Sequence, residues 1–277
     1  MPMNEVKVCM SIAGLDPSGG AGVVADVKTF TAFGCFATAA ITSVTYQNTT
    51  GVFGATHLDA ASIRGQIDAV MKDITVSAAK TGMIATKEGI SATAEILREW
   101  QVPFLVVDPV VRSTSGYDLI DDAALRSLID ELFPISTLVT PNKQEAERIA
   151  GIEMRGDEQI EQAARTMISM GASNVLIKGG HFDGIDSQIA MARDLLFCGD
   201  GSVQIFEEER IDTAATHGTG CTLAAAITAN LALGLDLAEA VRISKGFVTE
   251  AIRNGISVGR GNSPINIPRD ASTIDKI

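Results

Sequence analysis

Short apolar runs of strand length alternate with longer amphipathic stretches along most of the chain, and this alternation limits the possible folds severely. The runs lie at 6–13, 36–45, 104–107, 137–139 and 174–178, and they contain few charged residues, as strands buried on both faces do. The stretches between them have the spacing of amphipathic helices. We therefore expect an α/β protein, a three-layer αβα sandwich with a mostly parallel central sheet and helices on both faces.

The remaining segments refine this architecture. Helices are expected at 21–33, 60–73, 87–100, 121–132, 159–170, 221–233 and 237–254. The segment from Asp194 to Glu208 has shorter and more polar runs, which favours a small antiparallel edge on the sheet. Low-complexity linkers, blocks of charge and internal repeats are absent from the sequence, so we expect one domain over residues 1–277.

Composition excludes several classes of function. Hydrophobic residues make up 46% of the 277 residues and charged residues 20%, enough for a large core. The net charge of -12 disfavours nucleic acid and anionic membrane surfaces as partners. Apolar runs stay shorter than the roughly 18 residues of a membrane helix, and the N-terminus does not resemble a secretion signal, so a cytoplasmic protein is expected. The four cysteines form no CxxC pair, which argues against a disulfide framework or zinc site.

Two glycine-rich segments open predicted helices. The first, residues 13–22, matches neither GxGxxG nor GxxxxGK[ST], so it is either a flexible turn or a ligand-binding loop. The second, residues 216–221, precedes an alanine-rich helix. Free N–H groups at a helix start favour an anion, and glycines let the backbone approach it closely. We expect an anion hole there that suits a transferring phosphoryl group, with a plain glycine-rich turn as the alternative.

Polar residues at the ends of three other predicted strands suit phosphoryl transfer. Asp108 ends one strand, Asn142 and Glu145 follow the next, and Lys178 closes a third. Because Mg²⁺ takes one or two carboxylates and completes its shell with water and phosphate oxygens, Asp108 and Glu145 are candidate metal ligands through water. Lys178 is a candidate partner for nucleotide phosphate, or else an ordinary solvated lysine. Asn142 and Glu145 also fit a helix N-cap with its first-turn acid, and this role is compatible with organising a metal.

Seven segments together resemble, in order and spacing, the hydroxymethylpyrimidine/phosphomethylpyrimidine kinases of thiamine biosynthesis, within the ribokinase-like superfamily. They are IAGLDPSGGAGVVADVKTF (Ile12 to Phe30), YQNTTGV (Tyr46 to Val52), KTGMI (Lys80 to Ile84), VVDPV (Val106 to Val110), TPNKQEAE (Thr140 to Glu147), IKGGH (Ile177 to His181) and THGTGCTLAAAI (Thr216 to Ile227). The resemblance implies a ribokinase-like fold, ATP and Mg²⁺ as cofactors, and a homodimer. The implied activity phosphorylates 4-amino-5-hydroxymethyl-2-methylpyrimidine, and then its monophosphate to the diphosphate.

The same resemblance implies roles for individual residues. Gln47 matches the residue that recognises the pyrimidine, since an amide offers a donor and an acceptor to an aminopyrimidine edge. Asp26 is expected to hydrogen-bond a ring substituent or the hydroxymethyl group, and Met83 to pack on the ring. The residues that match the substrate pocket are Gly14, Ala21, Asp26, Thr45, Gln47, Met83 and Val110. Those expected to contact the nucleotide are Thr140, Asn142, Lys178, Thr216 and Gly218.

Cys221 stands where the sugar kinases of the superfamily have the aspartate base of a GAGD motif, and it is preceded here by Gly218, Thr219 and Gly220. These four residues form the expected catalytic set. A thiol has a reference pKa of about 8.5, which a helix N-terminus lowers, so a thiolate base is expected. In the alternative interpretation, Cys221 only shapes the pocket.

The sequence also departs from the family pattern, and other functions stay open. Leu15 stands where Ser or Thr is common, Tyr46 where a small residue is common, and the tail 261–266 only loosely matches GHGPVNH. A pyridoxal or pyridoxine kinase is the nearest alternative, although such relatives tend to carry an apolar residue at position 47. A nucleotide-binding regulator without catalysis is a further alternative, as is a purely structural protein, but neither explains Asp108, Glu145, Lys178 and Cys221 together.

Overall fold

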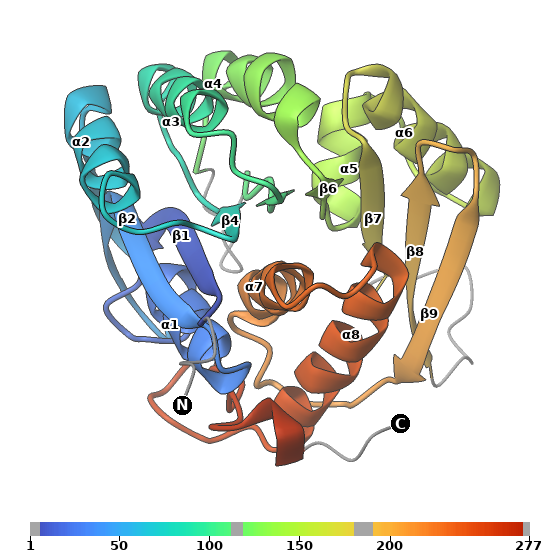
Figure 1. Ribbon diagram of the computed structural model, residues 1–277. Coiled ribbons are helices and arrows are strands. Elements are labelled where there is room, and N and C mark those ends of the chain that lie inside the picture. The colour runs from blue at the N-terminus through green and yellow to red at the C-terminus, as the bar shows by residue number, and fades with distance from the viewer. Residues whose placement is uncertain (1–5, 112–118, 180–190, 274–277) are drawn as a thin grey trace, which may run out of the picture.

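One nine-stranded sheet runs through the molecule (Figure 1). The computed structural model describes residues 6–111, 119–179 and 191–273, so Gly180 and His181 of the IKGGH motif lie outside the described residues. The strands are β1 (Val8–Leu15), β2 (Phe36–Asn48), β3 (Gly51–His57), β4 (Ala78–Thr81), β5 (Leu105–Val107), β6 (Leu138–Val139), β7 (Asn174–Gly179), β8 (Met191–Cys198) and β9 (Val203–Glu209). Their spatial order is β3-β2-β1-β4-β5-β6-β7-β8-β9.

The order of the strands creates a crevice beside β1. Strands β2, β1, β4, β5, β6 and β7 are parallel, and β1 lies between β2 on one side and β4 on the other. The chain therefore winds outward in both directions from β1. In open α/β sheets ligands bind beyond the carboxyl ends of the strands at such a point of reversal. The glycine-rich segment after β1 lies at this point.

Helices cover both faces of the sheet. The structure contains α1 (Gly22–Ala32), α2 (Ala60–Met71), α3 (Lys87–Glu99), α4 (Asp122–Ser127), α5 (Lys143–Ala150), α6 (Asp157–Ser169), α7 (Thr219–Ala232) and α8 (Leu237–Arg253). Helices α2 to α6 share one large apolar core with one face of the strands. On the opposite face, α7 and α8 pack on β5 to β8, and α1 packs with α7 on β1 and β4. The expected three-layer sandwich is confirmed.

The structure differs from the sequence expectation at a few elements. Antiparallel strands lie at both edges of the sheet, because β3 pairs with β2 at the edge opposite β8 and β9. Strands β3 and β4 were not expected, and helix α5 was expected only through the N-cap pattern of Asn142 and Glu145. The helix expected at 121–132 ends at Ser127, and a π-helical turn (Leu128–Leu132) and a 3-10 turn (Phe133–Ile135, with Pro134) follow it. Proline lacks an N–H donor and ends regular helix here.

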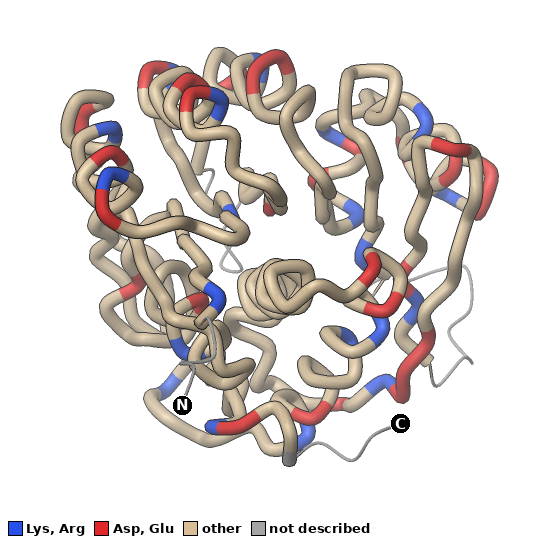
Figure 2. Tube along the Cα trace, viewed as in Figure 1, with Lys and Arg blue, Asp and Glu red and all other residues tan. Residues whose placement is uncertain are grey.

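The distribution of acidic residues and the lengths of the helices are both consistent with the amino-acid composition. Figure 2 shows acidic residues spread over the outer helices and the last strands rather than gathered in one patch. Among the described residues, the longest helix is too short and too polar to cross a membrane.

Candidate functional site

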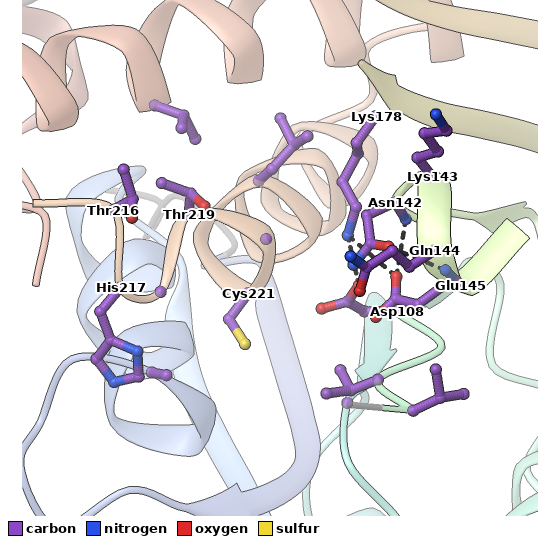
Figure 3. A pocket seen from close by; sticks show the side chains of 18 of the residues that line it. Asp108, Asn142, Lys143, Gln144, Glu145, Lys178, Thr216, His217, Thr219 and Cys221 are labelled. Carbon is purple, nitrogen blue, oxygen red and sulfur yellow. Dashed lines mark hydrogen bonds and ion pairs between the residues drawn. The ribbon is translucent and has the colours of Figure 1, made fainter. Parts of the chain in front are cut away.

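A cleft of about 1280 Å³ opens at the carboxyl ends of the parallel strands (Figure 3). It is lined by residues from the loops after β1, β4, β5 and β6, by Lys178 near the end of β7, and by the first turn of α7. The residues expected at the site that line it are Gly14, Ala21, Thr45, Gln47, Met83, Asp108, Val110, Asn142, Glu145, Lys178, Thr216, Gly218, Thr219, Gly220 and Cys221. Segments from across the sequence therefore meet at one end of the sheet.

The first turn of α7, where the sequence predicts an anion hole, has a backbone geometry that is compatible with one. Gly218 is the N-cap residue with φ +90°, and within the described residues no side chain caps the helix. A methyl group at Gly218 would collide with the carbonyl oxygen of Gly20 in the loop after β1, so this close approach requires glycine. The Thr219 N–H donates to the Thr216 carbonyl oxygen (3.4 Å), which leaves the next N–H groups, those of Gly220 and Cys221, for a ligand in the cleft, where the helix dipole favours an anion.

A buried cluster of one cation and two carboxylates lies beside the anion hole. The Lys178 ammonium is 2.9 Å from an oxygen of Asp108 and 3.9 Å from an oxygen of Glu145. Figure 3 shows these side chains converging on one side of the cleft, with Cys221 between them and His217. Carboxylates raise the pKa of Lys178 although burial lowers it, so the lysine stays charged. A Cβ atom on Gly220 would be 3.2 Å from Lys178 Nζ, which puts the ammonium against the anion hole.

Glu145 caps helix α5 and is also a buried carboxylate of the cleft. It completes a capping box with Asn142, in which Glu145 N–H donates to the Asn142 side chain (3.0 Å) and Asn142 N–H donates to the Glu145 carboxylate (2.8 Å). Burial raises the pKa of Glu145 to about 7, against the opposing effect of Lys178. Asp108 and Glu145 together carry one more charge than Lys178 neutralises, and a bound cation or a proton on Glu145 would neutralise this excess negative charge. This donor set fits Mg²⁺, which binds few carboxylates and takes its other ligands from water and phosphate.

Replacing Glu145 by glutamine is expected to stabilise the fold at neutral and alkaline pH. The folded pKa of about 7 lies above the ordinary value of 4.5, so the folded state loses stability as the pH rises between these values. Glutamine keeps an acceptor for the Asn142 N–H and carries no charge. We expect the free energy of unfolding in urea to rise by about 1–3 kcal/mol at pH 8, with a gain near zero at pH 4. An equal gain at both pH values would contradict this account.

Cys221 lies at the centre of the cleft, but its ionisation differs from the sequence expectation. Burial raises the pKa of the Cys221 thiol to about 11, whereas a helix N-terminus alone was expected to lower it. The positive charge of Lys80 and a hydrogen bond from the Gly22 N–H act in the opposite direction and favour the thiolate. Burial therefore disfavours the thiolate of Cys221, and the positive charge of Lys80 offsets part of this desolvation penalty.

Lys80 is a buried cation of the cleft that the sequence analysis did not single out, and it lies in the middle of the sheet. The Lys80 ammonium is 3.0 and 3.1 Å from the two oxygens of Asp26, and both side chains are 0% exposed. Asp26 also accepts a hydrogen bond from Ser11 (2.6 Å). The Asp26 carboxylate holds the pKa of Lys80 above its usual value despite burial. Asp26 therefore lies beneath the cleft rather than on its wall, and the hydrogen bond to substrate expected of it is replaced by this ion pair.

Packing explains why Lys80 faces Cys221. Ala78, two residues before Lys80 on the same face of β4, packs with Ala225 of α7. Lys80 follows Ala78 on β4 and Cys221 precedes Ala225 by one turn of α7, so both lie at the cleft end of these two elements. Thr140, expected to contact nucleotide, is also fully buried below the wall, where its hydroxyl is 3.4 Å from Asp108.

The other end of the cleft carries the residues expected to hold an aminopyrimidine. Gln47 projects from β2 at a bulge, where the pairing with β3 shifts between Tyr46 and Gln47. A bulge re-aims the side chain that follows it. The neighbouring wall is formed by Met83 and by Gly14, whose missing side chain makes room for the Met83 methyl group. The Thr45 hydroxyl donates to the Leu15 carbonyl (2.9 Å) and fixes the loop after β1.

A second feature that sequence reasoning missed joins the two glycine-rich segments. His217 Nε2 is 2.8 Å from a carboxylate oxygen of Asp16, and the same carboxylate accepts the N–H groups of Gly20 (3.2 Å) and Ala21 (2.9 Å). Burial alone would raise the pKa of Asp16, but hydrogen bonds from His217 and Ser18 bring it below its usual value. Both residues stand in the quoted motifs, yet their contact spans 201 positions and has no local signal.

Comparisons with known proteins agree with this geometry. Residues 16–266 match the family model described as phosphomethylpyrimidine kinase. The chain is 40% identical over 264 residues to the hydroxymethylpyrimidine/phosphomethylpyrimidine kinase of Haemophilus influenzae, covering 95% of this chain and 97% of the relative. It is 43% identical over 257 residues to the thiamine biosynthesis bifunctional protein ThiED of Geobacter sulfurreducens, covering 93% of this chain and 51% of that protein.

A solved structure of a pyridoxal kinase, the nearest alternative function, has the same fold. An ADP complex of Bacillus subtilis pyridoxal kinase is 32% identical, with a TM-score of 0.84, and the match covers 95% of this chain and 98% of the other. The two kinds of kinase therefore share one architecture, and the sequence identity is higher with the pyrimidine kinases.

Proposed function

Because the chain belongs to the phosphomethylpyrimidine kinase family, we propose that its cleft transfers the γ-phosphoryl group of ATP to an aminopyrimidine. The enzyme is a hydroxymethylpyrimidine/phosphomethylpyrimidine kinase, a phosphotransferase of thiamine biosynthesis. Its substrates are 4-amino-5-hydroxymethyl-2-methylpyrimidine and the corresponding monophosphate. Pyridoxal kinase activity is the less favoured alternative.

One observation carries the proposal. A single cleft has an amide, Gln47, at one end and an ammonium with two carboxylates at the other, and Cys221 and the anion hole lie between them. This arrangement suits a heterocycle held by its edge, with a hydroxymethyl group directed at a nucleotide phosphate. Phosphoryl transfer depends mainly on such positioning and on charge stabilisation.

Each group of residues has a task in the proposed reaction. The Gln47 amide pairs with the aminopyrimidine edge, while Met83 packs on the ring. Cys221 is the proposed base: burial raises its pKa to about 11, and the small thiolate fraction that Lys80 favours accepts the proton of the substrate hydroxyl. The hydroxyl oxygen attacks the γ-phosphorus, and ADP leaves. The N–H groups of Gly220 and Cys221 and the Lys178 ammonium stabilise the charge on the transferring group.

Further properties belong to the proposal. Asp108 and Glu145 would hold Mg²⁺, which neutralises the nucleotide phosphates; the pair of buried carboxylates at the cleft supports this role. The 277 residues form one kinase domain that works as a homodimer in the cytoplasm. The family resemblance supports the homodimer, and the net charge of -12 supports a protein that binds neither nucleic acid nor membrane.

Gln47→Met tests the recognition half of the proposal. Methionine has a similar length but offers no hydrogen bond to the aminopyrimidine edge, and its partner groups on the ring are left unpaired. We expect kcat/KM for hydroxymethylpyrimidine to fall about 30-fold, as for the loss of two hydrogen bonds, with KM for ATP unchanged. Gln162→Met, the same substitution at an exposed position of α6 outside the cleft, is the matched control. Unchanged pyrimidine kinetics in Gln47→Met would exclude this role for Gln47.

A further inference from the structure

The tip of the β2–β3 hairpin is bound by backbone N–H groups from near the end of the described chain. The carbonyl oxygen of Thr49 accepts a hydrogen bond from the Asn262 N–H (2.8 Å). The Thr49 hydroxyl oxygen accepts two more, from the N–H groups of Arg260 (3.2 Å) and Gly261 (3.3 Å). The N–H groups of the consecutive residues Arg260, Gly261 and Asn262 therefore all donate to Thr49, which lies more than 200 positions earlier in the sequence. We call residues 258–266 the C-terminal strap.

The fit between the strap and Thr49 requires small residues. A methyl group at Gly261 would collide with the Thr49 carbonyl group, and Gly259, with φ +76°, lies against the Thr49 side chain. Ser263 closes the strap on itself, because its hydroxyl lies within 3.3 Å of the Val258 N–H and 3.2 Å of the Val258 carbonyl oxygen. These contacts give a physical reason for the glycines and the serine of the tail, which the proposed chemistry leaves unused.

The other end of the same strap is bound to the loop that forms the anion hole. The His217 N–H donates to the Ser263 carbonyl oxygen (3.3 Å), and the Ile265 N–H donates to the His217 carbonyl oxygen (3.2 Å). Pro264 lies between these residues, beside Gly20 of the loop after β1. His217 is in turn paired with Asp16. In Figure 1 the red C-terminal segment runs beside the blue N-terminal part, consistent with these contacts.

The β2–β3 hairpin has little packing of its own to fix its position. β3 is an edge strand, paired with β2, and its residues are half-buried or exposed along its whole length. Tyr46 and Phe53 are 52% and 68% exposed, so little apolar packing holds this part of the hairpin. Gln47 stands only two residues before Thr49, on the strand that the strap holds.

We propose that the C-terminal strap, acting through Thr49, is a positioning element that fixes Gln47 relative to the anion hole. The strap connects the part of the cleft that recognises the ring to the part that binds the transferring phosphoryl group. The distance between the bound ring and the phosphoryl group is thereby fixed. Thr49 and Gly261 are its positioning residues, because they act through Gln47 and His217 rather than on the substrate. The inference rests on the proposed function for its kinetic consequence alone.

Kinetics of the full chain test the proposal with matched variants. Thr49→Val removes the hydroxyl acceptor and keeps the shape, so we expect KM for hydroxymethylpyrimidine to rise about fivefold, with KM for ATP within twofold of the unaltered protein. Thr49→Ser restores the acceptor and the KM. Gly261→Ala displaces the strap and raises KM for hydroxymethylpyrimidine about tenfold or more. Asn262→Ala is the control, because its side chain forms no hydrogen bond with the described residues and its backbone N–H remains.

Hydrogen exchange tests the strap without using activity. In Gly261→Ala the amides of the hairpin, residues 43–57, and of the loop 216–220 are expected to exchange at least tenfold faster, whereas Asn262→Ala matches the unaltered protein. A protein that phosphorylates no pyrimidine but shows this pattern would refute the proposed function and keep the structural link. The positioning role is overturned if Gly261→Ala and Thr49→Val leave hairpin exchange and KM unchanged, or if Asn262→Ala produces the same changes.

Discussion

Replacing Cys221 by alanine is expected to lower kcat by about 100-fold, with KM for ATP changed by less than about twofold. Alanine is a good helix former of similar size, so the start of α7 and its N–H groups stay in place. What is lost is the group that accepts the proton of the substrate hydroxyl. The measurement is steady-state phosphorylation of hydroxymethylpyrimidine at saturating ATP, together with nucleotide affinity from isothermal titration calorimetry.

The control for this variant is Cys198→Ala, which removes a half-buried thiol at the end of β8, outside the cleft. It is expected to leave kcat unchanged. Full kcat in Cys221→Ala would show that the thiol only shapes the pocket, and catalysis would then depend on positioning and charge stabilisation alone.

Replacing Lys80 by methionine is expected to cost about 3–5 kcal/mol of folding free energy, because it leaves the Asp26 carboxylate buried without its partner. Both side chains are 0% exposed, and the two N–O distances are 3.0 and 3.1 Å, so water does not compensate for the lost ammonium. Urea unfolding at neutral pH measures the effect. The variant is also expected to lose the positive charge that favours the Cys221 thiolate.

The double variant Asp26→Asn/Lys80→Met separates the two consequences of losing the ammonium. It removes both charges together, and replacing a whole buried ion pair is often close to neutral for stability. We expect it to recover most of the stability while kcat remains low. A double variant as unstable as Lys80→Met would contradict the ion-pair explanation, and one with full kcat would exclude an effect of Lys80 on Cys221.

Local patterns predicted much of the site. Asn142 and Glu145 cap a helix as their spacing indicated, and the residues at the ends of β5 and β7 converge because parallel strands end at one edge of the sheet. Strand β3 was not expected, because its glycines and exposed residues give no buried strand pattern.

Long-range pairing and burial account for what the sequence did not reveal. The partner of Asp26 lies 54 positions away, on a short strand whose lysine looks solvated when it is read alone. The direction of the Cys221 pKa shift depends on burial by distant elements, and helix position alone predicted the opposite sign. The contact between Thr49 and the strap spans more than 200 positions, and its donors are backbone N–H groups of the strap, so the strap sequence does not point to the Thr49 hydroxyl as the acceptor.

The most direct measurement of the central claim is kcat/KM of the purified chain with ATP and Mg²⁺ on hydroxymethylpyrimidine, its monophosphate and pyridoxal, side by side. The account predicts that both pyrimidines are phosphorylated and that hydroxymethylpyrimidine is preferred over pyridoxal by at least about tenfold, because the Gln47 amide pairs with an aminopyrimidine edge. A preference for pyridoxal, or no phosphoryl transfer to either pyrimidine, would contradict it.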